Sequence, residues 1–374
     1  MAGLYIHIPF CGSRCVYCGF YSTTALELRQ RYVDALCREL NMRKGELGIR
    51  NDIHTIYLGG GTPSQITIPQ LRQLFDTIYK YNKVATDAEI TIECNPDDVT
   101  DAFVEGLQTL PVNRISMGAQ TFDDTRLKFL HRRHTASQVV EAIDRFRKNG
   151  YTNISIDLMY GFPDETLDDW NHDITQALSL KVEHLSAYCL TIEEGTPLQQ
   201  MLLDGKIMEN DEELERQMYE TLIDRLETAG YEHYEISNFA RQGYRSHHNS
   251  SYWNGTPYIG IGAAAHSYDI RTRSWNVSDL HQYIDNIQRG KRPYEEELLD
   301  DDTRYNDTIT VALRTREGLD LTTLSERHRS YCLQNARRFL NDGLLTLDSV
   351  SRFLHLTRRG LFVSDMIMTE LIGQ

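Results

Sequence analysis

The chain has 374 residues, of which 40% are hydrophobic and 25% are charged, so it can build one large core with a smaller domain and is not disordered. Its net charge of −15, from 39 Lys and Arg against 54 Asp and Glu, argues against nucleic acid or an anionic membrane as a partner. No apolar run approaches the ~18 residues of a membrane span, and the start lacks the basic region of a signal peptide, so we expect a cytoplasmic protein.

Short β-rich runs alternate with longer amphipathic segments from residue 1 to about residue 240, a pattern typical of repeated βα units around a parallel sheet. The predicted strands are Leu4–Ile8, His54–Leu58, Glu89–Glu93, Arg114–Met117, Asn153–Asp157 and His184–Leu190. The predicted helices between them are Glu27–Lys44, Pro69–Tyr81, Thr100–Leu110, Ser137–Lys148 and Leu167–Leu180. Six units predict an α/β fold with an incomplete (β/α)6 barrel, whose functional residues lie at the carboxyl ends of the strands.

The rest of the chain predicts an extension and a small C-terminal domain. After a helix over Asp211–Ala229, the glycine spacing of Gly260–His266 fits a close-packed turn better than a dinucleotide loop, and the charged segment Gln288–Asp302 has the composition of a linker. Three short helices and a hairpin then predict a winged-helix-like tail that packs or binds a partner rather than DNA, over Asp307–Thr315, Leu321–His328, Leu333–Asn341 and Leu344–Leu356. We therefore divide the chain into residues 1–240, 241–290 and 291–374.

Three cysteines, Cys11, Cys15 and Cys18, lie within eight residues directly behind the first predicted strand. A loop this tight can turn all three sulfurs toward one metal centre, because thiolates hold iron-sulfur clusters and zinc. A structural zinc site needs four protein ligands, and His7 is the only nearby residue that could complete one, so the fourth metal position is expected to stay open. Zinc binding and a disulfide remain the alternatives.

The seven cysteines are an odd number, and their clustering argues against a disulfide framework and for a reducing compartment. The remaining cysteines stand alone and are expected to be buried free thiols, namely Cys37, Cys94, Cys189 and Cys332.

A glycine-rich run, Gly59-Gly60-Gly61-Thr62-Pro63, ends the second predicted strand. Glycines there let backbone groups approach a ligand closely, and a threonine hydroxyl adds a hydrogen bond, although a simple tight turn is the alternative. Glu93 closes the third strand, where a carboxylate can hold an ammonium group or ribose hydroxyls. The two strand ends together predict a small-molecule pocket.

Polar residues also follow the next strands. Gln120 comes after the fourth strand, Asp157 ends the fifth, and Arg132 can bind a carboxylate with a forked geometry. Taken singly, each of these polar residues is more often a helix cap or part of a surface ion pair than a ligand-binding group. Their placement on successive strand ends favours one shared site.

The cysteine spacing Cys-x3-Cys-x2-Cys after a first strand resembles the radical S-adenosylmethionine (SAM) superfamily, which implies a 4Fe-4S cluster on Cys11, Cys15 and Cys18 with SAM on its open iron. The order of the cysteines, GGGTP, ECNP, GAQ and IDLMYGFP looks like the oxygen-independent coproporphyrinogen III oxidase group of that superfamily, over nearly the whole chain. The resemblance implies SAM contacts from Tyr5, Gly60, Gly61, Thr62, Glu93, Gln120, Arg132, Asp157 and Thr191.

Two details separate the branches of this group. The oxidase proper carries a further cysteine where this chain has Phe20, and the run from His248 to Trp253 matches the HNxxYW motif of the haem-chaperone, HemW-like branch. The resemblance implies haem binding by His248, Asn249, Tyr252 and Trp253, with a histidine as a possible axial ligand and aromatic surface for the porphyrin. The alternative is a packed aromatic turn around a hydrogen-bonded histidine.

The resemblance implies a haem chaperone that delivers haem to acceptor haem proteins, respiratory ones among them, and that carries the cluster with exchangeable SAM. No catalytic residue is assigned, a reductant protein is a further expected partner, and a monomer or a homodimer fits. The alternative is an enzyme, the oxygen-independent coproporphyrinogen III oxidase, for which the fourth cysteine is missing. A radical SAM enzyme acting on another substrate is the third hypothesis.

Overall fold

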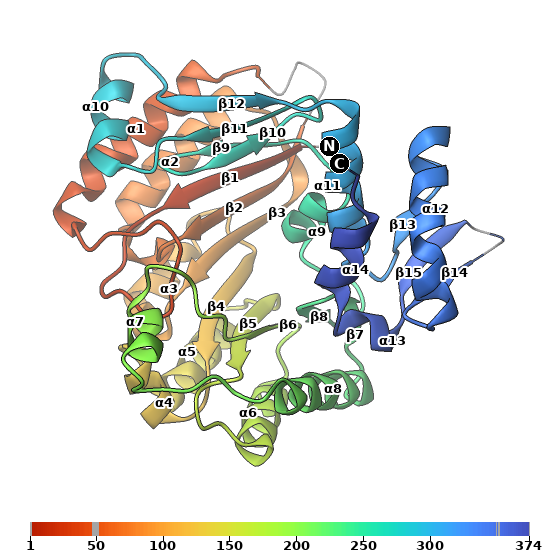
Figure 1. Cartoon of the computed structure of the whole chain (residues 1–374). Helices are drawn as coiled ribbons and strands as arrows, with labels where there is room; N and C mark the ends of the chain where they lie inside the picture. Colours follow the sequence, from red (N-terminus) through yellow and green to blue (C-terminus); the bar gives the residue numbers. More distant parts are fainter. Residues whose placement is uncertain (1, 47–51, 349, 351, 374) are drawn as a thin grey trace.

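The centre of the molecule is a long curved sheet (Figure 1) in a computed structural model that describes residues 2–46, 52–348, 350 and 352–373. Its twelve strands have the order β12-β11-β10-β9-β1-β2-β3-β4-β5-β6-β8-β7. The middle of the sheet consists of six strands that run parallel, β1 (Ala2–Ile8), β2 (Ile53–Gly60), β3 (Val84–Cys94), β4 (Arg114–Gln120), β5 (Ile154–Tyr160) and β6 (His184–Cys189). These confirm the six predicted strands, and the open strand order confirms an incomplete barrel.

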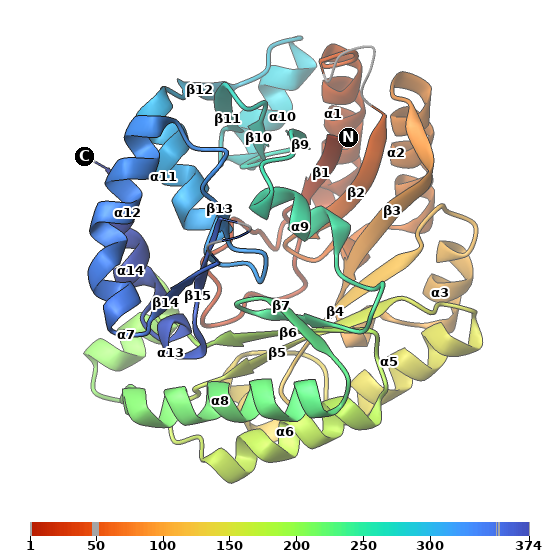
Figure 2. The ribbon, with the colours of Figure 1, turned by 90° about the vertical axis from the view of Figure 1, so that its right-hand side faces the viewer.

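Helices cover the outside of this arc, as Figure 2 shows. They are α1 (Arg29–Met42), α2 (Ile68–Tyr81), α3 (Asp101–Leu107), α4 (Asp124–Phe129), α5 (Ala136–Lys148) and α6 (Leu167–Ser179), with 3-10 turns at Leu26–Leu28, Pro63–Gln65 and Pro96–Asp98. Thr67 and Thr135 each begin a helix with a capping box, which fixes the start of α2 and α5. The predicted helices are confirmed, and α4 is an addition.

The strands are buried on both faces, and their apolar side chains join those of the helices in one large core. Trp170 of α6 is fully buried in it, and its indole N–H donates to the backbone oxygen of Met218 at 2.9 Å. The core holds the barrel strands at fixed positions, so the side chains at their carboxyl ends converge.

Residues beyond the barrel extend the sheet at both ends. The elements are α7 (Pro197–Leu203), α8 (Glu212–Thr228), β7 (Glu232–Glu235), β8 (Asn238–Ala240), α9 (His247–Trp253), β9 (Tyr258–Ile261), β10 (His266–Tyr268), β11 (Thr272–Asn276), α10 (Leu280–Gln288) and β12 (Tyr294–Leu298). Strand β9 runs parallel to β1, and β10, β11 and β12 follow as an antiparallel meander.

The loop between β9 and β10 is a close-packed turn, as the sequence indicated. A Cβ on Gly262 would lie 2.4 Å from the Tyr32 hydroxyl, and one on Gly260 would lie 2.0 Å from the backbone oxygen of His266. The prediction of a linker over Gln288–Asp302 was wrong, because β12 pairs with β11 there. All five β12 residues are exposed on a sheet edge, so their charged sequence carries no apolar strand signal.

The C-terminal domain has its own core and a three-stranded sheet of order β13-β15-β14, which confirms a winged-helix-like fold. Its elements are α11 (Asp301–Ala312), β13 (Leu319–Asp320), α12 (Glu326–Asn341), β14 (Leu345–Leu347), β15 (Phe353–Leu356), α13 (Arg358–Leu361) and α14 (Ser364–Leu371). The prediction of a helix over Leu321–His328 was wrong. The Ser325 hydroxyl caps α12, and the residues before Ser325 form the turn after β13. The boundaries at residues 240 and 290 stay predictions.

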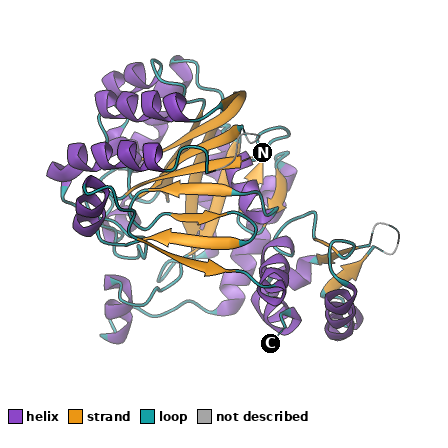
Figure 3. Ribbon diagram, turned by 90° about the horizontal axis from the view of Figure 1, so that it is seen from above, coloured by secondary structure: helices purple, strands orange, loops and turns teal. Residues whose placement is uncertain are grey.

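This domain lies beside the amino ends of the barrel strands, at the right of Figure 1, and Figure 3 shows it apart from the helices that cover the sheet. Two backbone hydrogen bonds attach it to the barrel, from Ile236 N to Arg314 O and from Arg316 N to Tyr234 O, each 3.0 Å. In the described part of the chain, no helix is long and apolar enough to cross a membrane.

Glu39 of α1 joins the barrel to its extension. Its carboxylate is fully buried and accepts hydrogen bonds from the Tyr283 hydroxyl at 2.6 Å, the Gly262 N–H at 2.9 Å and the Asn276 amide at 2.9 Å. Arg43 pairs with it at 3.4 Å. One carboxylate therefore ties α1 to the β9–β10 turn, β11 and α10.

We expect Glu39→Gln to lower the free energy of unfolding by about 3 kcal/mol, because it removes a buried charge and turns an amide NH2 toward other donors. Urea denaturation followed by circular dichroism measures the change. Glu46→Gln is the matched control, since Glu46 also pairs with Arg43 but is 45% exposed, and about 0–1 kcal/mol is expected there. Equal effects of the two variants would contradict the role of Glu39.

Candidate functional site

A cavity of about 700 Å³ lies at the carboxyl ends of the parallel strands, the position expected for the site of an α/β barrel. The cysteine loop forms one wall and strand ends form the others. All of the residues that the sequence analysis assigned to the cluster and SAM line this one cavity, namely Tyr5, Cys11, Cys15, Cys18, Gly60, Gly61, Thr62, Glu93, Gln120, Arg132, Asp157 and Thr191.

The three cysteines are free thiols, partly exposed toward the cavity. The Thr62 hydroxyl donates to the Cys11 sulfur at 3.4 Å, and Arg132 Nη1 donates to the Cys15 sulfur at 3.6 Å. Among the described residues, no three His, Cys, Asp or Glu side chains meet closely enough to hold a single metal ion. A cluster is different, because it spreads its thiolate ligands over separate irons around a bulky core.

His7, the one candidate for a fourth zinc ligand, is buried with both ring nitrogens engaged. Nδ1 lies 3.0 Å from the Tyr5 hydroxyl and Nε2 lies 3.1 Å from the backbone oxygen of Tyr21. Burial lowers the pKa of His7 to about 4, so the ring is neutral at pH 7. His7 thus supports the cavity floor and also the glycine run behind it.

The glycine run packs against this floor so closely that no side chain fits. A Cβ on Gly60, whose φ is +111°, would lie 2.5 Å from His7 Cε1, and one on Gly61 would lie 2.7 Å from the backbone carbon of Pro9. The backbone N–H of Gly60 donates to Glu93 Oε2 at 3.2 Å. The glycine run is therefore a tight turn and also a wall of the cavity, so both predictions for this segment apply.

Glu93 and Asp157 are two carboxyl groups deep in the cavity. The Tyr57 hydroxyl donates to Glu93 Oε1 at 2.7 Å, and burial raises the pKa of Glu93 to about 7. Burial likewise raises the pKa of Asp157 to about 6, although a hydrogen bond from Ser186 opposes it. Groups with such shifted pKa values in a cavity mark a site that is ready for a cationic or hydroxyl-bearing ligand.

Gln120 and Arg132 close the cavity on the β4 side. Gln120 follows a register shift between β4 and β5 and has a φ of +67°, unusual for a residue other than glycine. Arg132 Nη2 donates to Asn95 Oδ1 at 2.8 Å and to the Gly118 backbone oxygen at 2.7 Å. Arg132 therefore places a positive charge between the cysteine loop and the strand ends.

The HNxxYW run forms the short helix α9, and the structure separates its residues. Asn249 lines the cavity with the cysteines, whereas Tyr252 and Trp253 line a second cavity on the other side of α9. His248 lies between the two and is 1% exposed.

Both ring nitrogens of His248 have partners. Nδ1 lies 2.9 Å from the Thr55 hydroxyl and Nε2 lies 3.0 Å from the Tyr252 hydroxyl. Burial lowers the pKa of His248 to about 3. In this conformation the ring matches the hydrogen-bonded histidine that was the alternative for this motif, and an iron ligand would have to displace Thr55 or Tyr252.

Several cavity residues escaped the sequence analysis. Ser155 and His184 lie on β5 and β6, where the Ser155 hydroxyl and His184 Nδ1 are 2.7 Å apart, and His184 Nε2 lies 2.8 Å from the Tyr234 hydroxyl. Polar residues inside otherwise apolar parallel strands were the available signal, since such strands are buried on both faces. Others inside the strands are Arg114, Ser116, Ser186 and Tyr188, and Asn95 directly follows β3.

Comparisons with known proteins agree with this geometry. The model of the radical SAM superfamily matches residues 5–177. The chain is 35% identical to the heme chaperone HemW of Lactococcus lactis subsp. lactis, over 98% of this chain and 96% of that protein. It is 36% identical to the HemW of Bacillus subtilis, over 88% and 87% of the two chains.

The fold also matches a solved structure. Coproporphyrinogen III oxidase (HemN) from Escherichia coli superposes with a TM-score of 0.85 over 99% of this chain and 90% of that chain, at 22% identity. That likeness concerns the fold, whereas the curated relatives match in sequence along almost the whole length. The chain therefore belongs to the heme chaperone HemW family, within the radical SAM superfamily.

Proposed function

We propose that this protein is a haem chaperone, which binds haem, passes it to acceptor haem proteins and carries a 4Fe-4S cluster together with SAM. The observation that carries the proposal is its 33% to 35% identity, over 98% to 99% of the chain, to proteins named heme chaperone HemW from Mycobacterium tuberculosis and Lactococcus lactis. Relatives aligned from end to end share both the barrel and the C-terminal domain.

The cavity with the three cysteines fits the cluster and SAM. Cys11, Cys15 and Cys18 stand on one loop, have no disulfide partner and face the cavity, as thiolate ligands of a cluster must. When bound, the cluster and SAM supply one-electron chemistry at this place. The chain itself contributes the three thiols and the polar groups that line the cavity around them.

The polar groups of the cavity suit the parts of SAM. Glu93, held by Tyr57 and the Gly60 N–H, would bind the ammonium group, and Arg132 would bind the carboxylate. Asp157 would accept from the ribose hydroxyls, while Thr191 at the exposed rim would lie near the adenine. Tyr5, Gly61, Thr62 and Gln120 would complete the pocket.

The proposal also names the partners of the protein, its oligomeric state and its compartment. Respiratory haem proteins are the proposed acceptors, a reductant protein would deliver electrons, and the chain would act as a monomer or homodimer in the cytoplasm. All seven cysteines are free, which suits a reducing compartment.

A haem titration followed by transfer tests the function. We expect the anaerobically reconstituted protein to give a saturable Soret shift at about one haem per chain, and then to lose that haem to an acceptor apoprotein in excess. Vinyl porphyrin formed from coproporphyrinogen with SAM and dithionite would instead support the oxidase hypothesis. SAM turnover without haem binding would point to a radical SAM enzyme with another substrate.

Replacing Cys15 with Ala should reduce iron and sulfide to background and abolish the brown absorbance of the reconstituted protein, because a ligand is lost. Cys37→Ala is the matched control, since Cys37 is a partly buried thiol that accepts from Thr77 and lies outside the cavity. Unchanged iron content in the Cys15 variant would refute the ligand role.

SAM binding should depend on the protonation of Glu93. Because the pKa of Glu93 is about 7 and the ionised form binds the SAM ammonium, the affinity should fall about tenfold from pH 8 to pH 6, with one proton released on binding at low pH. Titration calorimetry across this range measures both effects.

Two variants assign this pH dependence. Glu93→Gln should bind SAM weakly at every pH. Asp157→Asn should keep the step but move it to lower pH, because burial raises the pKa of Glu93 and the charge of Asp157 raises it further. The same step in the Glu93→Gln protein would assign the titration to another group.

A further inference from the structure

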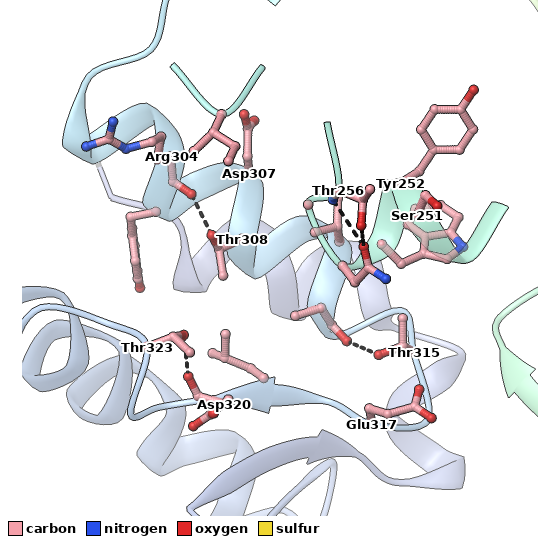
Figure 4. A pocket seen from close by; sticks show the side chains of 18 of the residues that line it. Ser251, Tyr252, Thr256, Arg304, Asp307, Thr308, Thr315, Glu317, Asp320 and Thr323 are labelled. Atoms are coloured by element: carbon pink, nitrogen blue, oxygen red, sulfur yellow. Dashed lines mark hydrogen bonds between the residues drawn. The ribbon is translucent and has the colours of Figure 1, made fainter. Parts of the chain in front are cut away.

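A second cavity of about 900 Å³ lies on the far side of α9, between the barrel and the C-terminal domain. Its walls come from α9, the β10–β11 hairpin, α11 and the turn between β13 and α12. Figure 4 shows Arg304, Asp307 and Thr308 of α11 opposite Asp320 and Thr323, with Tyr252 and Thr256 to one side. The volume is in the range of cofactor sites, roughly 300–1,000 Å³.

The helix α9 separates this cavity from the one with the cysteines. Glu89 accepts the backbone N–H groups of His247 and His248 at 3.0 and 2.9 Å, and His248 is bound to Thr55 of β2. In Figure 2, α9 lies in front of the barrel strands, on the side of their amino ends. The two cavities therefore open at opposite ends of the barrel.

The second cavity has an aromatic lining. Trp253, Tyr258, Tyr268 and Tyr305 line it together with Tyr252, and the Trp253 indole N–H is buried without a hydrogen-bond partner in the described part of the chain. The apolar side chains of Val311, Leu319 and Leu324 line the same cavity. Walls of this kind suit a flat conjugated ring.

Ile270 adds an exposed apolar side chain to the rim of the cavity. It lines the cavity from the β10–β11 turn, with a φ of +79° and 49% exposure. A β-branched residue is strained in this region of φ, and a turn would accept Asn or Gly more easily. The protein thus keeps a large apolar side chain at the rim where folding alone would favour a smaller polar residue.

Charges surround the cavity in pairs. Arg245, Arg273 and Arg304 line it, and each is paired with an acidic residue. The partner of Arg304 is Asp301, whose side chain is 82% exposed, so this pair is the one that another carboxylate can most easily replace. Arg304 is therefore the group to which a carboxylate of a bound ligand would turn.

We propose that haem, the cargo of the chaperone, sits in this cavity between α9 and the C-terminal domain, with its ring against the aromatic wall and Ile270 and a propionate at Arg304. The inference rests on the proposed function and adds the location to it. In this arrangement His248 is a positioning residue that holds α9, and haem and SAM occupy separate cavities.

The first test is a haem titration of the reconstituted full-length protein with and without saturating SAM. We expect the haem dissociation constant to change less than about twofold, because α9 separates the two sites. A haem dissociation constant that rises in proportion to SAM would place haem in the cavity with the cysteines and overturn the proposal. A wild-type protein that binds no haem would refute the proposed function itself.

The second test compares variants in the same titration. Ile270→Asn should weaken haem about tenfold while the protein becomes no less stable, because Asn tolerates the positive φ and offers no apolar surface. Arg304→Glu should weaken haem by a similar factor, of about tenfold, through repulsion of the propionate. Arg271→Glu is the matched control, since Arg271 is exposed in the same turn but does not line the cavity, and it should stay within about twofold.

Iron-free protoporphyrin IX should rank the wild type and the three variants in the same order of affinity as haem, because the cavity is expected to recognise the ring and the propionates. Retained SAM binding and circular dichroism show that each variant is folded. Wild-type haem affinity in both folded variants, Ile270→Asn and Arg304→Glu, would move the haem site elsewhere.

Discussion

The anchoring of α9 inside the amino end of the barrel determines how the rest of the molecule is used. The helix is only seven residues long, too short to be stable by itself, and it is held by the Glu89 carboxylate at its first N–H groups and by the bond between His248 and Thr55. Arg114 lies 3.7 Å from the same carboxylate, so the buried charge has a partner. Seven residues from outside the barrel thereby lie between the cavity with the cysteines and the second cavity.

The two cavities differ in the side chains that line them. On the side of the strand carboxyl ends lie thiols, carboxyl groups with raised pKa values and an arginine, which suit a charged metal cofactor and its polar ligand. On the other side, aromatic rings and branched apolar side chains line the cavity together with paired charges and hydroxyl groups, which suits a flat ring that carries carboxylates. The proposed chaperone would thus keep cofactor and cargo on one scaffold without competition for space. The β9–β12 meander, tied to α1 through Glu39, places the β10–β11 hairpin at the wall of the second cavity.

The HNxxYW run illustrates the difference between a motif and a site. As a sequence, its histidine, asparagine and aromatic residues read as one binding surface. Asn249 and Trp253 lie one turn apart along α9, and the tertiary structure places Asn249 at one cavity and Trp253 at the other. His248 is buried between the two cavities, with a neutral ring whose nitrogens both have partners. The same residues are therefore expected to act through different contacts.

The sequence by itself determined the parallel core of the fold and the residues at the strand ends that line the cavity with the cysteines. Hydrophobic runs and capping residues predicted the six strands and their helices, because these signals are local in the sequence. The spacing of Cys11, Cys15 and Cys18 predicted a metal-binding loop, because all three thiols come from one short segment. The exposed, charged strand β12 and the turn before α12 were missed, because an edge strand and a cap depend on neighbours more than on local pattern. Tertiary structure alone decided that His184 lines the same cavity as the cysteines, and that α9 lies between the two cavities. It also decided that residues about fifty positions apart, such as Trp253 and Arg304, share a cavity. These features depend on packing between segments that are distant in the chain, and such packing produces no periodic pattern of residue types in either segment.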